Sequence, residues 1–427
     1  MQQRFVTMLG KSVKRIAQLR GGGSALPGLF VEKIDPKFIA RTLSNLPLGV
    51  ILISGTNGKT TTTKMVVELL QGQGLAVFTN RTGSNFTRGV AAALLGEVDS
   101  KGNLSADVAV LELDEAHAVH FVRAVKPRFS LLLNVMRDQL DRFGEIDKTA
   151  ELLHKIAEHT TEGIVLNRDD PRLGSAPFIK NLSAPVRTYG VSQQLSHLFP
   201  SDDSMRGEQS HQAATITQTS DDVTLQSVDD QKAVIHYADK DHSVQLKLKG
   251  IYNVQNAVGA VALVRMVLGD KLDEQQMLMS LSNVLPAFGR GESIMINGDS
   301  CELVLVKNPS GFRLSLKSFD PSGHATMIAI NDEYADGRDM SWLWDVDFDN
   351  LQNEGVAVVS GVRAYDMALR LQYDEVEPKY VNTDLSSSLN QFLSTTSGQP
   401  KRIYCSYTAM LALRRELAKQ TNVEIIR

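Results

Sequence analysis

The residues whose types and spacing are best suited to chemistry form one short stretch, Gly55-Thr56-Asn57-Gly58-Lys59-Thr60-Thr61. It follows an apolar run typical of a buried strand, Val50–Ser54, and precedes a helical pattern at Thr60–Leu70. Glycines between a strand and a helix let backbone N–H groups surround phosphate oxygens, and the helix N-terminus adds a partial positive charge. Lys59 supplies a cation for the terminal phosphates, and the Thr60 hydroxyl is placed to hold Mg²⁺. The stretch therefore predicts an ATP-binding loop.

The loop is a shortened variant of the general phosphate-binding pattern. That pattern has a glycine five residues before the Gly-Lys step, where this chain has Ile53. A glycine turn that merely joins strand to helix is the structural alternative, but lysine and threonine follow in the positions that phosphate and metal require. Glu112 lies near the end of a later apolar run, VAVLEL. A carboxylate there is expected to hold the metal that Thr60 touches. A helix cap is the simpler reading of Glu112.

The elements that position this loop are predicted to form a parallel sheet built from strand–helix units, which is an α/β fold. Val108–Leu113, Phe129–Asn134 and Gly163–Asn167 are apolar runs that end in or beside Asn or Glu and precede helical or turn-rich sequence. Polar residues at strand ends lie together at the carboxyl edge of a parallel sheet, where ligands bind. A polar stretch at about 196–232 is expected to be an exposed insertion.

A second α/β unit begins near Cys301, and we expect two domains. Residues 1–297 would form the ATP-binding domain, with a short N-terminal extension, and residues 298–427 a smaller Rossmann-like C-terminal domain. Strands are predicted at Thr326–Ile330 and Gly355–Ser360, with a helix after the latter.

Composition is that of an ordinary globular protein, with 427 residues, 42% hydrophobic residues and a net charge of -4. This balance gives no overall attraction to nucleic acid. No apolar run approaches the ~20 residues that span a bilayer, and the N-terminal stretch lacks the features of a signal peptide, so a cytoplasmic protein is predicted. Basic residues in that stretch are typical of a solvated helix face, with contact to a membrane left open.

Several further motifs occur together in an order that carries a family resemblance. GTNGKTTTT, LLLNVMRDQLDRFGE, VLNRDDP, GIYNVQNAVGAVAL and AFGRGE resemble the Mur ligases and the folylpolyglutamate-synthase-like enzymes. The segments ALPGL, NRTGSNFTRG, LVKNPSGF, NDEYADGRDMSWLWDVDF and SGVRAYDMALRL are similar to the MurT branch, the Mur-ligase-like subunits of lipid II isoglutaminyl synthases. The resemblance runs from about residue 24 to the C-terminus.

The resemblance implies a Mur-ligase-like central ATPase domain and a division of labour between two subunits. A GatD-type glutamine amidotransferase would release ammonia from glutamine. The present chain would use ATP and Mg²⁺ to activate the α-carboxyl of D-glutamate in the lipid II stem peptide as an acyl phosphate, giving D-isoglutamine at the inner face of the membrane.

The resemblance also assigns roles to residues outside the loop. Asn256 would contact the nucleotide base, and Arg290 would reach the phosphates, for which an amide and a planar guanidinium are suitable groups. Gln139 stands where related ligases have a histidine that organises a second metal, which puts a second Mg²⁺ in doubt. Many members carry a four-cysteine zinc ribbon, but the matching region contains no cysteine, so no zinc is predicted; His197 and His211 alone cannot hold one.

An acidic block surrounds two tryptophans in the second domain. The family implies that one aspartate here completes a Cys–His pair in the partner subunit, as a carboxylate orients a histidine in a catalytic triad. Asp345 is the predicted residue, and Asp339 and Asp347 are the next candidates. Turn or capping roles are the alternative for several of the block's aspartates, which are Asp336, Asp339, Asp345, Asp347 and Asp349.

Two other functions stay open at this point. A freestanding amino-acid ligase would need no glutaminase, but would be expected to keep the histidine replaced by Gln139 and a carbamylated lysine that has no counterpart here. A non-catalytic ATP-binding scaffold would not need the metal and phosphate contacts that the chain retains.

Overall fold

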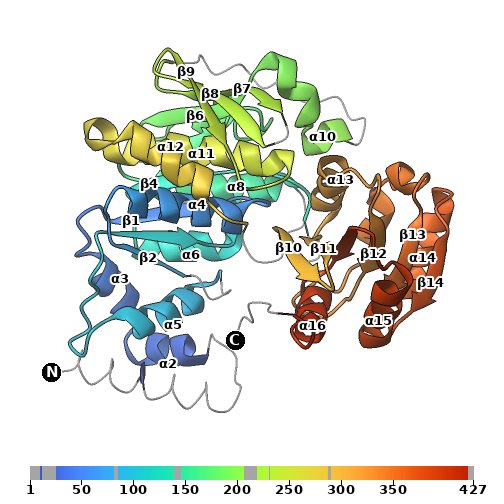
Figure 1. Ribbon diagram of the computed structural model, residues 1–427. Coiled ribbons are helices and arrows are strands. Elements are labelled where there is room, and N and C mark those ends of the chain that lie inside the picture. The colour runs from blue at the N-terminus through green and yellow to red at the C-terminus, as the bar shows by residue number, and fades with distance from the viewer. Residues whose placement is uncertain are drawn as a thin grey trace. The chain divides into compact units, whose positions relative to one another are not determined.

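The computed structural model describes residues 10–11, 26–80, 85–138, 146–205, 219–229, 231–286 and 290–421. The chain divides into two compact units (Figure 1). The first comprises residues 1–136, 145–247 and 253–284, and the second comprises residues 137–144, 248–252 and 285–427. Each unit is built on one sheet, as expected for two α/β domains.

The first unit contains a nine-stranded sheet with the order β2-β3-β1-β4-β5-β6-β7-β8-β9. The strands from β2 to β7 are parallel, and β8 and β9 add an antiparallel meander at one edge. The strands are β1 Val50–Ser54, β2 Val77–Thr79, β3 Val108–Glu112, β4 Phe129–Leu132, β5 Gly163–Asn167, β6 Val186–Val191, β7 Val223–Asp229, β8 Lys232–Tyr237 and β9 Lys240–Gln245.

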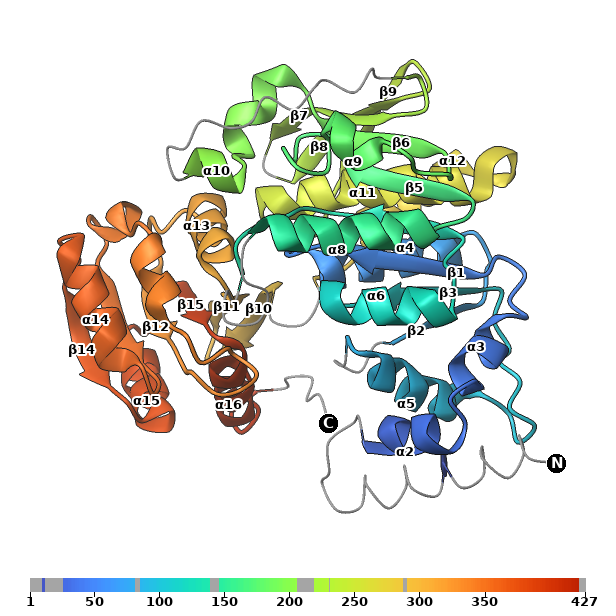
Figure 2. The ribbon, with the colours of Figure 1, turned by 180° about the vertical axis from the view of Figure 1, so that it is seen from behind.

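Helices cover both faces of the parallel part of this sheet. Figure 1 shows α4, α11 and α12 on one face, and Figure 2 shows α6 and α8 on the other. The helices are α2 Leu26–Ile34, α3 Phe38–Leu43, α4 Lys59–Gly72, α5 Thr87–Glu97, α6 Glu115–Ala124, α8 Ile146–His159, α9 Ala176–Ile179, α10 Asp202–Met205, α11 Ile251–Leu268 and α12 Glu274–Asn283, with 3₁₀ turns η1 Gln193–Leu198 and η2 Gly269–Lys271.

Burial explains why the central strands are continuous apolar runs. Every residue of β1, β4 and β5 is buried, because a parallel sheet covered on both faces leaves neither side of a strand to solvent. In β8 buried and more accessible residues alternate instead. This is the pattern of a strand with one covered face.

The second unit contains a six-stranded sheet with the order β10-β11-β15-β12-β13-β14. Only β10 is antiparallel to its neighbour. The strands are β10 Arg290–Ile296, β11 Asp299–Leu305, β12 Ala325–Ala329, β13 Val356–Ser360, β14 Pro378–Asn382 and β15 Lys401–Cys405. β15 follows all the others in sequence but lies between β11 and β12.

Two hydrophobic layers enclose this second sheet. On one face the sheet packs with α13 Pro309–Ser318, α14 Ala364–Tyr373 and the 3₁₀ turns η3 Ser341–Asp345 and η4 Asp349–Leu351. On the other face it packs with α15 Leu385–Thr395 and α16 Tyr407–Leu417.

Two expectations about the chain's organisation need correction. The junction predicted between residues 297 and 298 would cut the β10–β11 hairpin, whose strands pair from Arg290 to Val304, so the second unit includes β10. The insertion predicted at 196–232 contains β7, which pairs with β6 and buries Val223 and Leu225. β7 was not predicted as a strand because its alternating sequence includes Thr and Ser and lies within a polar stretch.

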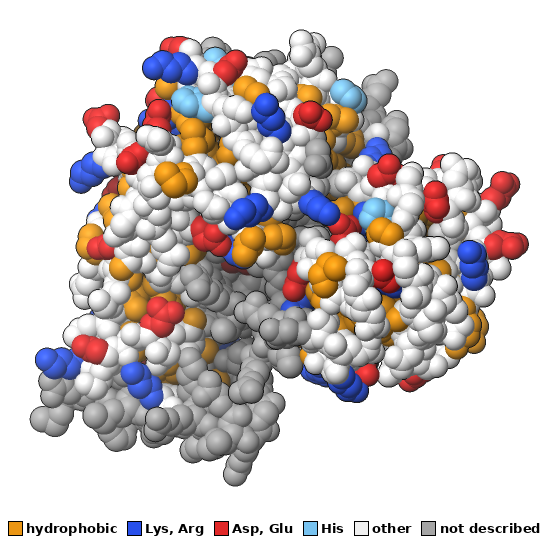
Figure 3. Space-filling model, viewed as in Figure 1, with side chains coloured by type: hydrophobic (Ala, Val, Ile, Leu, Met, Phe, Trp, Pro, Cys, Tyr) orange, Lys and Arg blue, Asp and Glu red, His pale blue; other side chains and the backbone are white. Residues whose placement is uncertain are grey.

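One helix of the described chain is long and apolar enough to cross a membrane, contrary to the expectation from the sequence. It spans Ile251–Lys271, made of α11 and η2. Ten residues of α11 are buried within the first unit, so its apolar composition is accounted for by packing against the sheet. Figure 3 shows Lys and Arg side chains interspersed with Asp and Glu on the viewed face, without a strongly charged field of one sign.

Candidate active site

The predicted phosphate loop lies between β1 and α4, as expected. Gly55 and Gly58 have φ angles of 136° and 87°, a region that residues with a Cβ rarely adopt. Gly58 is the N-cap of α4, so the loop leads directly into the positive end of a 14-residue helix. Thr61 is buried in the first turn of that helix, behind the loop.

Lys59 is held at the loop by hydrogen bonds and an ion pair. Its ammonium donates to the carbonyl oxygens of Gly55, at 2.5 Å, and Thr56, at 3.2 Å. It also forms an ion pair with the Glu115 carboxylate at 3.4 Å, and both side chains are almost fully buried. The sequence analysis did not single out Glu115; its signal is an acid at the start of the helix that follows Glu112.

Thr60 and Glu112 meet as predicted. The Thr60 hydroxyl donates to Glu112 Oε1 at 2.9 Å, and both residues are partly exposed at the end of the sheet. Asn80, at the end of β2, fixes the Glu112 backbone by donating to its carbonyl at 2.8 Å and accepting from its N–H at 3.0 Å. The metal ligands expected from the sequence are therefore adjacent.

Residues that follow β4 fix the other side of the loop by hydrogen bonds. Asn134 accepts from the Asn57 N–H at 2.8 Å and donates to the Asn57 carbonyl at 3.1 Å. The Thr56 hydroxyl accepts from the Met136 N–H at 3.0 Å and donates to the Met136 carbonyl at 3.2 Å. These bonds fix the loop conformation without using the side chain of Lys59.

A buried carboxylate in the VLNRDDP motif supports this β4 segment in turn. Asp170 accepts backbone N–H bonds from Val135 at 2.6 Å, Arg172 at 2.9 Å and Leu173 at 3.0 Å. Its burial raises the pKa of the carboxyl group to about 6. Asp170 therefore joins the ends of β4 and β5 through Val135, which lies between Asn134 and Met136.

Asn256 lies beside the last glycine of the loop. A Cβ added to Gly58 would come within 2.6 Å of Asn256 Oδ1, so glycine leaves the space that the amide occupies. The amide thus faces the N-terminus of α4, while its predicted contact with the nucleotide base stays a prediction. The predicted Arg290 side chain, together with Gln139 and His211, lies outside the described residues.

The described residues contain no group of three or more His, Cys, Asp and Glu side chains arranged to hold a metal ion. The candidate magnesium ligands are one hydroxyl and one carboxylate, Thr60 and Glu112. Such a partial set suits Mg²⁺, which commonly takes one or two protein oxygens and completes its shell with phosphates and water. The residues present therefore fit a nucleotide-bound magnesium ion.

In the second unit, two aspartates of the acidic block accept hydrogen bonds from other residues of that unit. Asp336 accepts from the Thr408 N–H at 2.8 Å, the Thr408 hydroxyl at 2.5 Å and the Glu333 N–H at 3.1 Å, and its burial raises the carboxyl pKa. Asp339 accepts from the Ser341 N–H at 2.9 Å, and bonds from Ser341 lower its pKa. Both roles agree with the capping alternative.

Of the remaining aspartates of the block, two are exposed and one, Asp345, is partly buried. Asp347 is 68% exposed in its side chain and lies 3.4 Å from the Arg313 guanidinium. Asp349 is exposed at the start of η4. Asp345 ends η3, is partly buried, and directly follows the half-exposed Trp344. Its place next to an exposed aromatic ring is the feature that sets it apart within the block.

Comparison with known proteins agrees with both units. A family model described as Mur ligase middle domain matches residues 53–264, and one described as MurT ligase C-terminal matches residues 305–410. The chain belongs to the Mur ligase family, in its MurT branch.

Relatives of the MurT branch match this chain over nearly its full length. The "Lipid II isoglutaminyl synthase (glutamine-hydrolyzing) subunit MurT" of Streptococcus pneumoniae is 29% identical, over 97% of this chain and 96% of its own. Its counterpart in Staphylococcus aureus strain COL is 27% identical, over 90% and 91%. The MurT-type match at residues 305–410 includes the whole acidic block.

Solved structures show the Mur ligase fold. A pseudomurein peptide ligase type C from Methanothermus fervidus has a TM-score of 0.67 at 19% identity, covering 89% of this chain and 80% of that one. A folylpolyglutamate synthase from Mycobacterium tuberculosis, solved with ADP and AMPPCP, has a TM-score of 0.60 at 16% identity, covering 91% and 96%. The predicted α/β Mur ligase fold is thus confirmed.

Proposed function

We propose that this MurT-type chain is the ATP-dependent ligase subunit of a lipid II isoglutaminyl synthase. It would amidate the α-carboxyl of D-glutamate in the lipid II stem peptide, with ammonia from a GatD-type glutamine amidotransferase. The observation that carries this proposal is the union, in one chain, of a pre-formed phosphate loop and a MurT-type C-terminal domain. The reaction would take place in the cytoplasm, at the inner face of the membrane.

The first unit supplies the groups that ATP needs. Backbone N–H groups of residues 55–60 and the N-terminus of α4 surround the phosphates, and Lys59 adds a positive charge. Thr60 and Glu112 would hold Mg²⁺, which neutralises phosphate charge as the terminal phosphoryl group is transferred. Asn256 and Arg290 stay proposed contacts to the base and the phosphates.

The chemistry divides into two displacements. A carboxylate oxygen of D-glutamate attacks the γ-phosphorus, the bond to the ADP oxygen breaks, and an acyl phosphate forms. Ammonia then attacks the acyl carbon, phosphate leaves with the bonding electrons, and the nitrogen loses a proton to give the amide. Lys59 stabilises the negative charge on the transferred group, and Glu115 orients Lys59 through their buried ion pair.

The second unit would serve the partner. Under this proposal Asp345 accepts a hydrogen bond from the histidine of the partner's Cys–His pair, and so selects the tautomer that activates the cysteine. Asp347, which pairs with Arg313, and Asp339, which accepts from the Ser341 N–H, are the next residues to test in the same block.

A reconstituted reaction tests the whole proposal. The chain, co-expressed with a GatD-type glutaminase, is given lipid II, ATP, Mg²⁺ and glutamine, and mass spectrometry follows conversion of the carboxylate into a carboxamide. Product that requires all components supports the proposal. Product formed from an added amino acid without the glutaminase would instead identify a freestanding ligase, and ATP binding without any product would identify a scaffold.

A further inference from the structure

One oxygen of a buried carboxylate beside the phosphate loop has no hydrogen-bond partner among the described residues. Asp114 follows β3, two residues after Glu112 and directly before Glu115. The residue is only 6% exposed, and no described group donates to its Oδ1 atom. A buried carboxylate is costly unless it accepts hydrogen bonds or meets a cation, so an unpaired one requires an explanation. The contacts of the folded chain do not supply that explanation.

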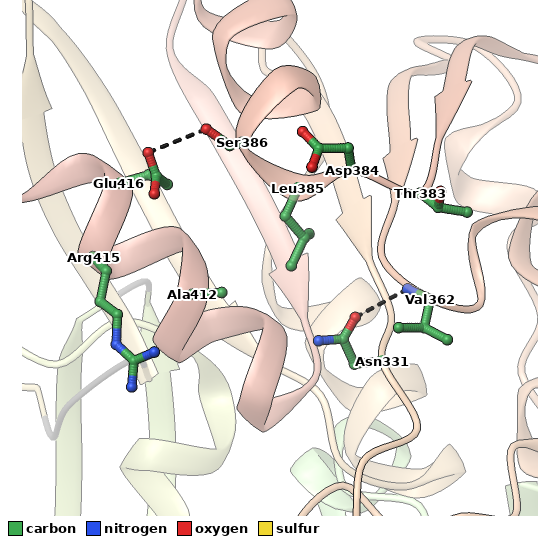
Figure 4. A pocket seen from close by; sticks show the side chains of 9 residues that line it. All are labelled: Asn331, Val362, Thr383, Asp384, Leu385, Ser386, Ala412, Arg415 and Glu416. Atoms are coloured by element: carbon green, nitrogen blue, oxygen red, sulfur yellow. Dashed lines mark hydrogen bonds between the residues drawn. The ribbon is translucent and has the colours of Figure 1, made fainter. Parts of the chain in front are cut away.

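Asp114 occupies the N-cap position of α6 but does not cap this helix. An Asp at an N-cap usually accepts from a backbone N–H of the first helical turn, and no such bond forms at α6, whose residues are all described. Asp384 shows the ordinary arrangement at the N-cap of α15. It lines the pocket of Figure 4, and its carboxylate accepts from the Ser387 N–H at 2.7 Å. Capping, the commonest structural role for such a residue, therefore does not account for the Asp114 side chain.

The backbone around Asp114 is tied to the strand that leads into the phosphate loop. Leu113, the preceding residue, donates its N–H to the Ile53 carbonyl at 3.3 Å, and its carbonyl accepts from the Ser54 hydroxyl at 2.9 Å. Asp114 itself donates its N–H to the Asn85 carbonyl at 3.1 Å. These bonds hold Asp114 at the carboxyl end of the sheet, which is the end where the loop lies and where ligands bind in such folds.

The carboxylates on either side of Asp114 both contact loop residues. Glu112 accepts from the Thr60 hydroxyl and is a candidate magnesium ligand, whereas Glu115 pairs with Lys59. A magnesium ion held by one hydroxyl and one carboxylate keeps several of its water molecules. Water on a metal ion is a strong hydrogen-bond donor, and a nearby carboxylate is the acceptor that suits it.

We propose that Asp114 accepts hydrogen bonds from water molecules on the magnesium ion of bound Mg·ATP. The proposal rests on the proposed function and deepens it, because it adds a third residue to the pair of Thr60 and Glu112. Asp114 is a positioning residue in this arrangement, since it orients the ion through water and touches no reacting atom. A contact through water also agrees with the described residues, which contain no group of three side chains arranged to bind a metal directly.

Asp114→Asn tests the proposal through nucleotide binding rather than turnover. Isothermal titration calorimetry measures the Kd of the full chain for the ATP analogue AMPPCP, once with excess Mg²⁺ and once with EDTA. The preference for Mg·AMPPCP over metal-free AMPPCP should fall by about 10–100-fold, the usual effect of losing an outer-shell partner of a metal. Affinity for metal-free AMPPCP should not fall, because the substitution removes a negative charge near the phosphates.

The unfolding temperature of the nucleotide-free variant is the second readout. Asparagine removes an unpaired buried charge at nearly the same volume, so this temperature should equal or exceed that of the parent chain. Asp114→Ser repeats the test with a small neutral residue that suits an N-cap, in case the amide disturbs folding. A lower unfolding temperature in both variants, with the preference for Mg·AMPPCP unchanged, would show a structural role and overturn the proposal.

Two controls separate the position of Asp114 from its charge. Asp107→Asn makes the same change in charge just before β3, at the opposite end of that strand, where Asp107 accepts from the Ala76 N–H at 2.8 Å. Asp384→Asn makes it at the cap of α15 in the second unit. Both variants should keep the preference for Mg·AMPPCP. An equal loss of preference in either control would mean that any lost carboxylate has this effect, which would overturn the proposal.

The remaining outcomes separate the proposal from its foundation. If the parent chain binds AMPPCP neither with Mg²⁺ nor with EDTA, the proposed function itself fails, and the role of Asp114 fails with it. If the parent chain prefers Mg·AMPPCP and Asp114→Asn keeps that preference, while the KM for free ammonium rises, Asp114 serves the nitrogen donor instead. That result would overturn the proposal and leave the proposed function standing.

Discussion

The phosphate loop and the acidic block of residues 336–349 both follow a buried parallel strand, yet they differ in where their partners lie. Lys59, Thr60 and Asn57 all contact groups of the first unit, so the loop is complete within this chain. In the acidic block Asp336 caps local backbone, whereas Asp345 sits beside an exposed tryptophan. Under the proposed function, the first site is assembled before its ligand arrives, whereas the chemistry of the second would depend on another protein.

The largest expected effect tests the self-contained loop. Lys59→Ala should reduce amidation to background, a loss of about 10³-fold or more, with either glutamine or ammonium as the nitrogen source, because phosphate charge is then uncompensated. Coupled assays of ADP release measure this. Lys64→Ala is the matched control, since Lys64 lies five residues further along α4 in a partly exposed pair with Glu68.

The Lys59 experiment also requires a check on folding. Removal of Lys59 leaves Glu115 buried without its ion pair, which destabilises the first unit. The double variant Lys59→Ala with Glu115→Gln removes this unpaired charge and should recover the unfolding temperature without recovering turnover. Recovery of turnover in the double variant would contradict the role of Lys59 at the phosphates.

The next effect tests dependence on a partner. Asp345→Asn should slow glutamine-dependent amidation by about 10²–10⁴-fold, because an amide can leave the partner's histidine in the wrong tautomer. ATP binding and ammonium-dependent amidation should persist. Asp347→Asn serves as the control. Loss of ammonium-dependent amidation in Asp345→Asn would instead place Asp345 in the ligase site.

A moderate effect on the free energy of unfolding is expected at Asp170, which holds the segment that follows β4. Asp170→Ala leaves three backbone N–H groups without their carboxylate acceptor, so the free energy of unfolding should fall by about 2–4 kcal/mol. Urea denaturation measures this. Asp169→Ala is a comparison variant, since Asp169 accepts a backbone N–H only from Val191.

The pH dependence of that effect follows from the raised pKa. The folded state holds a proton on Asp170 up to about pH 6, whereas the unfolded chain releases it near 3.8. The folded state therefore binds more protons between these values, and the contribution of Asp170 to stability falls as pH rises through this window. The difference in unfolding free energy between the parent and Asp170→Ala should be larger at pH 4.5 than at pH 7.5, by on the order of 2 kcal/mol.

The smallest effect belongs to the exposed end of the acidic block. Asp347→Ala removes a solvent-exposed ion pair with Arg313 and should change the unfolding free energy by less than about 0.5 kcal/mol. Asp336→Ala removes a buried cap of α16 and should cost about 2–3 kcal/mol. Equal costs for these two variants would contradict the division of the block into structural and accessible carboxylates.

The sequence was sufficient to predict the phosphate loop because its chemistry is local. Gly58, Lys59 and Thr60 are consecutive, and Glu112 ends the strand next to β1, so the strand pattern alone brings them together. Asn134 was visible only as a polar strand end, and its contact with Asn57 spans 77 residues.

Other features depended on long-range packing that periodicity does not encode. Glu115 resembles any acid in the first turn of a helix until Lys59 is placed beside it. β10 was assigned to the wrong domain because hairpin pairing with β11, rather than composition, decides its place. The segment that forms α14 was predicted as a helix, but nothing in its spacing distinguishes its exposed side, with Tyr365 and Tyr373, from its buried one.

The position of β15 has a consequence for how this protein is made. Ribosomes deliver the chain from the N-terminus, so β11 and β12 emerge well before Lys401–Cys405, the strand that separates them. During that interval two apolar strands expose unpaired edges, which are templates for association with other nascent chains. The first unit can complete its sheet far earlier, because all its strands precede residue 246. Synthesis therefore delivers a finished first unit, which holds the phosphate loop, before a finished second unit, and a chain stopped before residue 401 would be prone to aggregate.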